Sequence, residues 1–268
     1  MTVEDIKKMS YTQFVAFIDQ WNVPPGSLDT INQWAVFGHV DKESNVLEIA
    51  CTTGLSSREI SRITGCRAKG IDICMDSITS AQMNAQIYGQ NLQLEYECSD
   101  ACTYKPHEKY THLIIGASLG FFKKPDILLN RIPEFFGQSG YVLAAPYYSS
   151  GIMPECLKQE CQRVIGITPT TTEYNDVRNI YADFEVAYEK RCHIVLETKE
   201  QMEKYTQDSI KRACELRGIT DPDVIDYMYK RLYEIKYISN ELHQYQAYSV
   251  MVLRYLKGVY PNKFLELF

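Results

Sequence analysis

The chain has 268 residues, 45% of them hydrophobic, and a formal net charge of −6. This length and composition allow one large domain with a sizeable core and argue against disorder. The negative charge argues against a surface built mainly to neutralise phosphates, so we expect no nucleic acid partner.

Two further features of the sequence bear on compartment and metals. No apolar run approaches the roughly 20 residues that span a bilayer, and the start "MTVEDIKKMS" carries acids and lysines where a signal peptide is apolar. We therefore expect a cytoplasmic protein without a membrane partner. The nine cysteines are scattered and form no C-x-x-C pair. They predict buried thiols in a reducing compartment, with no metal site.

The N-terminal 40 residues read as helical. An amphipathic segment, residues 3–21, opens the chain, and Pro24, Pro25 and Gly26 interrupt it before Ser27, which can cap a second helix. Two helices are thus predicted in residues 1–40, ahead of the first strand.

Strands and helices then alternate through residues 41–150. Strands are predicted at 45–51, 68–74, 92–100, 111–117 and 140–148, and helices at 56–64, 75–89 and 124–136. Such alternation predicts an α/β fold, a parallel sheet with helices on both faces.

The regular alternation of strands and helices ends after residue 150. A helix is predicted near 154–167, a strand at 184–195, two polar helices at roughly 199–217 and 222–243, and a last strand at 247–256. Because the two polar helices lie between two strands, we interpret residues 199–243 as an insertion within one domain of residues 1–268.

Acidic residues lie within or near the end of three of the early strands. Ligands of open parallel sheets bind beyond the carboxyl ends of the strands, where the strand order reverses. Glu48 lies in the first strand, Asp72 near the end of the second and Asp100 at the end of the third. An acid at Asp72 is suitably placed to accept hydrogen bonds from two ribose hydroxyls. No G-x-G-x-x-G occurs, which argues against a dinucleotide-dependent oxidoreductase.

The stretch "VLEIACTTG", residues 46–54, resembles the first motif of the class I S-adenosylmethionine-dependent methyltransferases, in which an acid is followed by G-x-G-x-G. Glu48 and Gly54 keep the acid and the last glycine, whereas Ala50 and Thr52 replace the first two glycines. The resemblance covers residues 24 to about 150, and the C-terminal third only as a last pair of strands. It implies a Rossmann-like, seven-stranded, mostly parallel sheet whose last strand is antiparallel.

The resemblance also implies a set of cofactor-binding residues. The loop would contact the methionine end, Asp72 the ribose and Asp100 the adenine, while residues 114–122 occupy the place of the fourth motif. The implied set is Glu48, Ala50, Thr52, Gly54, Asp72, Ile73, Ser99, Asp100, Ala101 and Gly116. Structural alternatives remain open: Glu48 could pair at the strand end, Asp72 could serve a turn, and Asp100 could cap the next loop.

The acceptor side is less defined. The resemblance implies that residues 199–243 form a lid that decides the substrate without contributing to cofactor binding. This segment and its flanks are rich in tyrosine, which could shape a pocket for an amine, a phenol or a carboxylate, or could only pack helices. His193 and His243 are candidate general bases, and Tyr147 is a third catalytic candidate. The N-P-P-Y sequence typical of nucleic acid base methylation is absent.

The function predicted from these features is methyl transfer from S-adenosylmethionine to oxygen, nitrogen or carbon of a small-molecule acceptor, with S-adenosylhomocysteine as the product. Two alternatives remain: a catalytically silent S-adenosylmethionine-binding or scaffold protein and, ranked below it, a dinucleotide-dependent oxidoreductase. The sequence leaves a homodimer open.

Overall fold

The computed structural model describes residues 1–21 and 23–261. The helices are Val3–Lys8 (α1), Tyr11–Phe17 (α2), Ser27–Phe37 (α3), Leu55–Thr64 (α4), Met75–Tyr88 (α5), Pro125–Phe135 (α6), Glu155–Val164 (α7), Tyr174–Asn179 (α8), Lys199–Arg217 (α9) and Pro222–His243 (α10), with a 3-10 turn at Ser118–Phe121 (η1). The strands are Asn45–Ile49 (β1), Arg67–Asp72 (β2), Leu94–Cys98 (β3), Tyr110–Gly116 (β4), Phe136–Ala144 (β5), Tyr147–Ser149 (β6), Glu185–His193 (β7) and Gln246–Leu256 (β8).

The strands form one mixed sheet in which β3, β2, β1, β4 and β5 are parallel neighbours in that order. β8 runs antiparallel to β5, as predicted. The predicted count of seven strands is wrong, because the described part of the chain forms a sheet of eight. The additional strand is β6, which resumes pairing with β8 after Pro146, whereas β7 pairs along the other edge of β8. Proline has no N–H to donate to a ladder, so the interruption falls at that residue.

Successive residues of the central strands point to opposite faces, and each face has its own core. Leu47 and Ile49 of β1 pack with Leu128 and Ile132 of α6. Val46 packs on the other face in a cluster built from α3 and α4, among them Ile31, Trp34 and Ile60. The period-2 alternation of buried side chains therefore places helices on both faces, as predicted.

Three helices precede the first strand in residues 1–21 and 23–44, so the prediction of two is wrong. The first segment divides at Ser10, whose hydroxyl accepts a hydrogen bond from the Gln13 amide at 3.2 Å. The Gln13 side chain in turn accepts from the Ser10 amide at 3.0 Å. This capping box starts a new helix at Tyr11. The N-cap of α3 is Gly26, not Ser27 as predicted.

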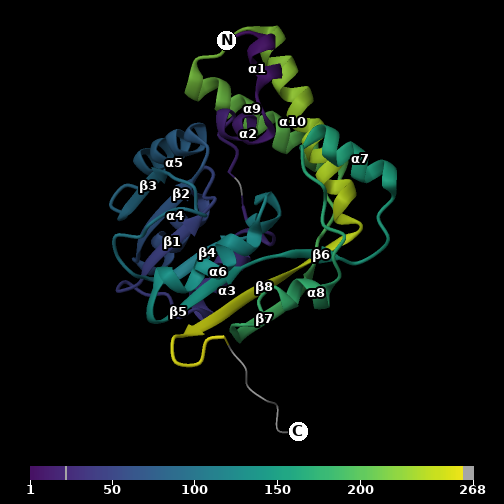
Figure 1. Cartoon of the computed structure of the whole chain (residues 1–268). Helices are drawn as coiled ribbons and strands as arrows, with labels where there is room; N and C mark the ends of the chain where they lie inside the picture. The colour runs from purple at the N-terminus through teal and green to yellow at the C-terminus, as the bar shows by residue number, and fades with distance from the viewer. Residues whose placement is uncertain (22, 262–268) are drawn as a thin grey trace.

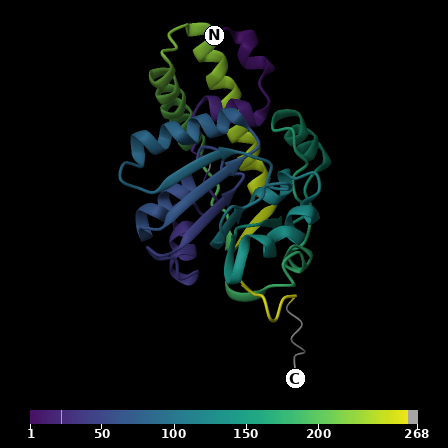
Figure 2. The same cartoon turned by 60° about the vertical axis from the view of Figure 1, so that its left-hand side comes forward.

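The helices α9 and α10 begin and end where the sequence predicts, but they do not stand apart from the rest. Their buried side chains, including Met228 and Leu232, form one core with Ile6, Phe14 and Ile18 of the N-terminal segment. Figures 1 and 2 show α1, α9 and α10 together at the end of the molecule opposite the C-terminus. Because β8 is antiparallel and starts just after α10, this group stands at the carboxyl edge of the parallel strands.

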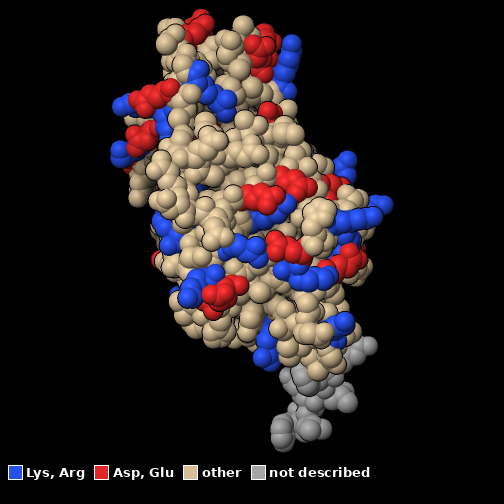
Figure 3. Space-filling model, turned by 90° about the vertical axis from the view of Figure 1, so that its left-hand side faces the viewer, with Lys and Arg blue, Asp and Glu red and all other residues tan. Residues whose placement is uncertain are grey.

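The described surface carries charges of both signs. On the face shown in Figure 3, lysine and arginine side chains are interspersed with aspartate and glutamate. Within residues 1–21 and 23–261, every helix falls short of the length and apolarity that a membrane span requires.

Candidate functional site

The loop after β1 has an unusual backbone. Ala50, Thr52 and Gly54 all have positive φ, at 54°, 46° and 74°. These alternate positions are the ones that hold glycine in a G-x-G-x-G loop, and a left-handed conformation costs an alanine or threonine on the order of 1 to 2 kcal/mol. The backbone of this loop therefore has the conformation of a G-x-G-x-G loop, although Ala50 and Thr52 carry side chains where such a loop has glycine.

The path of this loop is fixed by several hydrogen bonds. The Cys51 amide donates to the Ile71 carbonyl of β2 at 3.1 Å, and the Gly54 amide donates to the Cys51 carbonyl at 2.8 Å. The Thr53 hydroxyl donates to the Gln20 carbonyl at 3.0 Å. The surrounding structure therefore imposes the positive φ values, as expected where strain persists at a functional site.

We expect glycine to be tolerated at the first two of these positions. The variant Ala50→Gly/Thr52→Gly should keep its free energy of unfolding or gain up to about 1 kcal/mol per position. Glycine relieves the strain of the positive φ values in the folded state, and the greater flexibility that it gives the unfolded chain offsets part of this gain. Gly54→Ala should lose about 2 kcal/mol or more, since its Cβ would lie 2.6 Å from the Tyr96 ring. Urea denaturation measures both. A clear loss of stability in the double glycine variant would show that the two side chains, not the backbone path, are what the loop requires.

Glu48 ties the first strand to the following helix. Its buried carboxylate accepts a hydrogen bond from the Ser57 amide in the first turn of α4 at 2.9 Å. Burial raises the pKa of this carboxyl group, and the hydrogen bonds of Ser57 oppose the rise. A carboxylate near a helix N-terminus also complements the helix dipole. The alternative of a structural contact at the strand end is thus observed, and a contact with a methionine group stays a prediction.

Asp72 joins two loops at the end of β2. Its carboxylate accepts hydrogen bonds from the Thr52 amide at 3.0 Å and from the Cys74 amide at 2.8 Å, one on each oxygen. Burial raises the pKa of Asp72, and these backbone donors oppose the rise. A carboxylate can accept about four hydrogen bonds, so each oxygen has capacity for one more donor.

Apolar side chains are exposed beside this carboxylate. Ile73 is 74% exposed and Met75 is 61% exposed. Large apolar side chains exposed next to a polar anchor mark a surface suited to a ligand with a flat apolar part.

The remaining predicted cofactor residues line the neighbouring strand ends. The Ser99 amide donates to the Asp72 carbonyl, and the Asp100 carboxylate accepts from the Cys102 amide at 2.8 Å, so Asp100 does cap the next turn. Ala101 is buried. Gly116 ends β4 with a φ of 58°, and nothing lies within 4 Å of where its Cβ would be.

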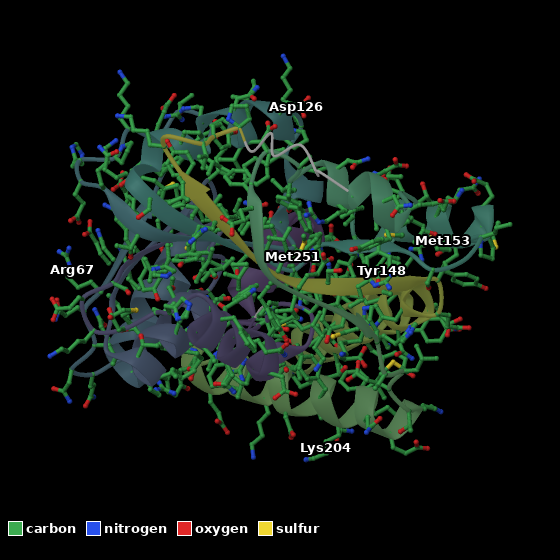
Figure 4. All side chains as sticks on the ribbon, turned by 90° about the horizontal axis from the view of Figure 1, so that it is seen from below. Arg67, Asp126, Tyr148, Met153, Lys204 and Met251 are labelled. Carbon is green, nitrogen blue, oxygen red and sulfur yellow. The ribbon has the colours of Figure 1, made fainter. Side chains whose placement is uncertain are left out.

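Two of the three catalytic candidates come together. The rings of Tyr147 in β6 and His243 at the end of α10 stack with centroids 6.2 Å apart and planes at 21°. Figure 4 shows Tyr148, the neighbour of Tyr147, beside β8, with Met251 farther along that strand. His193 is exposed at the end of β7, across β8 from β6. Two strand spacings, about 9.5 Å, therefore separate its backbone from β6.

Burial shifts the pKa values of the stacked pair in opposite directions. It raises the pKa of Tyr147, and the nearby phenols of Tyr11 and Tyr248 add to the rise. It lowers the pKa of His243, as does the charge of Lys236, while Glu197 opposes the change. Both side chains are therefore neutral at pH 7, and His243 is able to accept a proton.

The sequence did not single out two neighbouring aromatic rings. Tyr11 at the start of α2 stacks on Phe121 of η1, with centroids 6.5 Å apart and planes at 10°. Phe121 lies in the stretch that resembles the fourth motif, but no local pattern predicts its contact with Tyr11, 110 residues earlier. In the described residues no group of three or more His, Cys, Asp or Glu side chains is placed to hold a metal ion.

Comparison with known proteins gives one family match, since residues 46–135 match the family model described as a methyltransferase domain. Solved structures resemble the chain over most of its length. The MccD protein is 24% identical with a TM-score of 0.70, covering 87% of this chain and 99% of that one.

Two further structures are similar in the same way. An S-adenosylmethionine-dependent methyltransferase from Geobacter sulfurreducens, in complex with S-adenosylhomocysteine, is 15% identical with a TM-score of 0.64, covering 90% of this chain and 96% of that one. Coclaurine N-methyltransferase, bound to N-methylheliamine and S-adenosylhomocysteine, is 10% identical with a TM-score of 0.64, covering 94% and 85%. At these identities the structures establish a shared fold.

Proposed function

We propose that this chain, which has the class I methyltransferase fold and matches a methyltransferase domain model over residues 46–135, transfers a methyl group from S-adenosylmethionine to a small-molecule acceptor. The observation that carries the proposal is the edge formed by the 50–54 loop, Asp72 and Ile73. It combines a loop with the glycine-type backbone, a carboxylate with spare acceptor capacity and an exposed apolar side chain. A fold alone does not determine a reaction, so the proposal depends on this edge.

The residues present fit this cofactor. Asp72 would hold the ribose hydroxyls, and Ile73 would cover one face of the adenine, which explains its 74% exposure. Asp100 and Ala101 would lie at the adenine edge, and Gly116 leaves open space beside the loop. The methionine end would meet the loop between Ala50 and Gly54.

The catalytic demands on the chain are modest. When bound, the cofactor supplies a methyl group already activated by a sulfonium. The chain has to align the acceptor, exclude water and, for an O–H or N–H acceptor, take up a proton. His243 is the candidate for that last task because it is neutral at pH 7 and lies at the carboxyl edge, stacked on Tyr147. His193 lies across β8 from Tyr147 and is a weaker candidate.

A small acceptor is supported by three observations. Both signs of charge are interspersed on the face in Figure 3, unlike a footprint for nucleic acid phosphates. The stacked rings of Tyr147 and His243 suit a small organic molecule. Coclaurine N-methyltransferase, which has the same fold, is bound to the small molecule N-methylheliamine.

The test begins with binding and proceeds to chemistry. Calorimetry should show binding of S-adenosylmethionine and S-adenosylhomocysteine and none of NAD. Incubation with methyl-labelled cofactor and a broad acceptor panel should then give a labelled product together with S-adenosylhomocysteine. Binding without transfer to any acceptor would favour the catalytically silent alternative. Formation of 5′-methylthioadenosine in place of S-adenosylhomocysteine would show that another substituent of the sulfonium is transferred.

A thiol at the same edge gives a prediction independent of turnover. Cys98 is exposed at the end of β3, where it lies beside Asp72 in the strand register. S-adenosylmethionine should therefore slow its alkylation by iodoacetamide, as followed by peptide mass spectrometry. Cys156, exposed on α7, is the matched control and should react at an unchanged rate. Equal reactivity of Cys98 with and without the cofactor would place the nucleoside elsewhere.

A further inference from the structure

Two stacked aromatic pairs flank the end of α10 at the carboxyl edge. One is Tyr147 with His243, and the other is Tyr11 with Phe121. Tyr11 packs against a cluster that contains Leu242, the residue before His243. The Tyr11 phenol also lies close enough to Tyr147 to act on its pKa. The two pairs are therefore neighbours, although they come from four separate elements.

One of these four aromatic side chains, Phe121, is exposed to solvent. Phe121 is 49% exposed, although Tyr11, on which it stacks, is half-buried. η1 directly follows β4 and Gly116, so the exposed ring lies just beyond the strand whose end is proposed to face the cofactor. An exposed aromatic ring in that position offers stacking area to a second ligand.

The charges around the set decide what kind of ligand it favours. Burial raises the pKa of Tyr11 to about 12, so this phenol and that of Tyr147 are both neutral at pH 7. Lys236 and Glu197 are the charged groups that act on His243, and they form an ion pair with each other. Lys236 also lies 4.6 Å from the centroid of the Tyr205 ring. Glu197 is thus already engaged, and Lys236 opposes a second cation.

From this arrangement we infer that the acceptor is an uncharged, planar aromatic or heteroaromatic molecule that carries an O–H or N–H group and binds among Tyr11, Phe121, Tyr147 and His243. The inference rests on the proposed function and names its substrate class. At His243 a cationic amine would meet Lys236, and an anion would find that lysine already paired with Glu197. A flat neutral ring gains stacking area and offers its proton to His243.

The proton and electrons balance without any further reactant. The acceptor's lone pair forms the new bond to the methyl carbon, and the carbon–sulfur bond breaks with its electron pair staying on sulfur. The acceptor's proton passes to the neutral imidazole of His243, which becomes imidazolium and later returns the proton to water.

The experiment measures binding of probe molecules, so it needs no knowledge of the natural acceptor. Calorimetry or saturation-transfer NMR would compare 2-naphthol with 2-naphthoate and with choline, on protein with and without S-adenosylhomocysteine. We expect 2-naphthol to bind more tightly than either charged probe. Phe121→Leu should weaken its binding about fivefold or more, the size of one lost aromatic contact, and leave the affinity for S-adenosylhomocysteine unchanged.

A matched control comes from the other end of the molecule. Phe37 is also partly exposed and stacks on a tyrosine, Tyr188, with centroids 3.7 Å apart. Phe37→Leu should leave 2-naphthol binding unchanged. Tighter binding of choline or 2-naphthoate, or equal 2-naphthol affinity in Phe121→Leu and wild type, would overturn the inference. Failure of S-adenosylhomocysteine to bind would instead overturn the proposed function, and the naphthol comparison made without it would then show only whether these rings bind a neutral aromatic molecule.

Discussion

Replacing Asp72 with alanine is expected to weaken S-adenosylmethionine binding by about tenfold or more, because two ribose hydroxyls would lose a charged acceptor. The structure adds a second effect that the sequence did not predict. The carboxylate also accepts the amides of Thr52 and Cys74. Leaving two partly buried donors without partners should lower the free energy of unfolding by about 1 to 3 kcal/mol. Calorimetry measures the affinity, and urea denaturation measures the stability.

The control for this variant removes a different carboxylate from a nearby position. Asp76 is exposed in the first turn of α5, four residues farther along the chain. Asp76→Ala should change both affinity and stability much less than Asp72→Ala. Equal affinities of wild type and a folded Asp72→Ala protein would remove the central residue of the proposed cofactor site.

The sequence predicts most elements here because their boundaries are set locally. α9 and α10 occupy residues 199–217 and 222–243 as predicted, since Thr198 caps the first helix, Gly218 ends it and Pro222 opens the second. The S-x-x-Q pattern at Ser10 was an equally local signal, and it was missed. β6 is different, because a three-residue strand exists only through its pairing with β8.

The residues of the candidate site also fall into two groups, those that could be predicted from the sequence and those that could not. The loop after β1, Asp72 and Asp100 follow from the order of strands and their ends, so their association at one edge could be predicted. Ala50 and Thr52 depart from the motif in sequence but keep its backbone, since both have positive φ. The contacts of Tyr11 with Phe121 and of Tyr147 with His243 depend on how distant elements dock, and no local pattern encodes that.

The helical pair α9 and α10 has a second task besides the proposed lid. The N-terminal strap, residues 18–21, lies between this pair and the cofactor loop. Arg212 of α9 donates to the Asp19 carbonyl at 2.6 Å, and Thr53 of the loop donates to the Gln20 carbonyl. The Trp21 ring contacts two arginines. The guanidinium of Arg212 in α9 lies 4.9 Å from the ring centroid, and that of Arg58 in α4 lies 5.3 Å from it. The structure does not test the prediction that residues 199–243 make no contribution to cofactor binding, but these contacts lead us to propose that α9 acts on the cofactor loop through the strap.

Replacing residues 199–243 with a short Gly/Ser linker is accordingly expected to cost both stability and S-adenosylmethionine affinity. It would expose Ile6, Phe14, Phe17 and Ile18, which are buried against this pair. At about 1.5 to 3 kcal/mol for each buried side chain, the loss approaches the whole stability of a typical domain as an upper bound. Circular dichroism and thermal unfolding should show that the N-terminal helices are lost.

A single substitution isolates the link through the strap. Arg212→Met keeps most of the side chain's apolar length but removes its hydrogen bond to Asp19, so it should weaken S-adenosylmethionine binding severalfold while the protein stays folded. Lys211→Met, the exposed neighbour on the same helix, should bind the cofactor as wild type does. If Arg212→Met and the linker variant both fold and bind the cofactor normally, the helices act on the acceptor alone. If only the linker variant fails, they support the fold through their shared core, and the strap does not transmit their position to the loop.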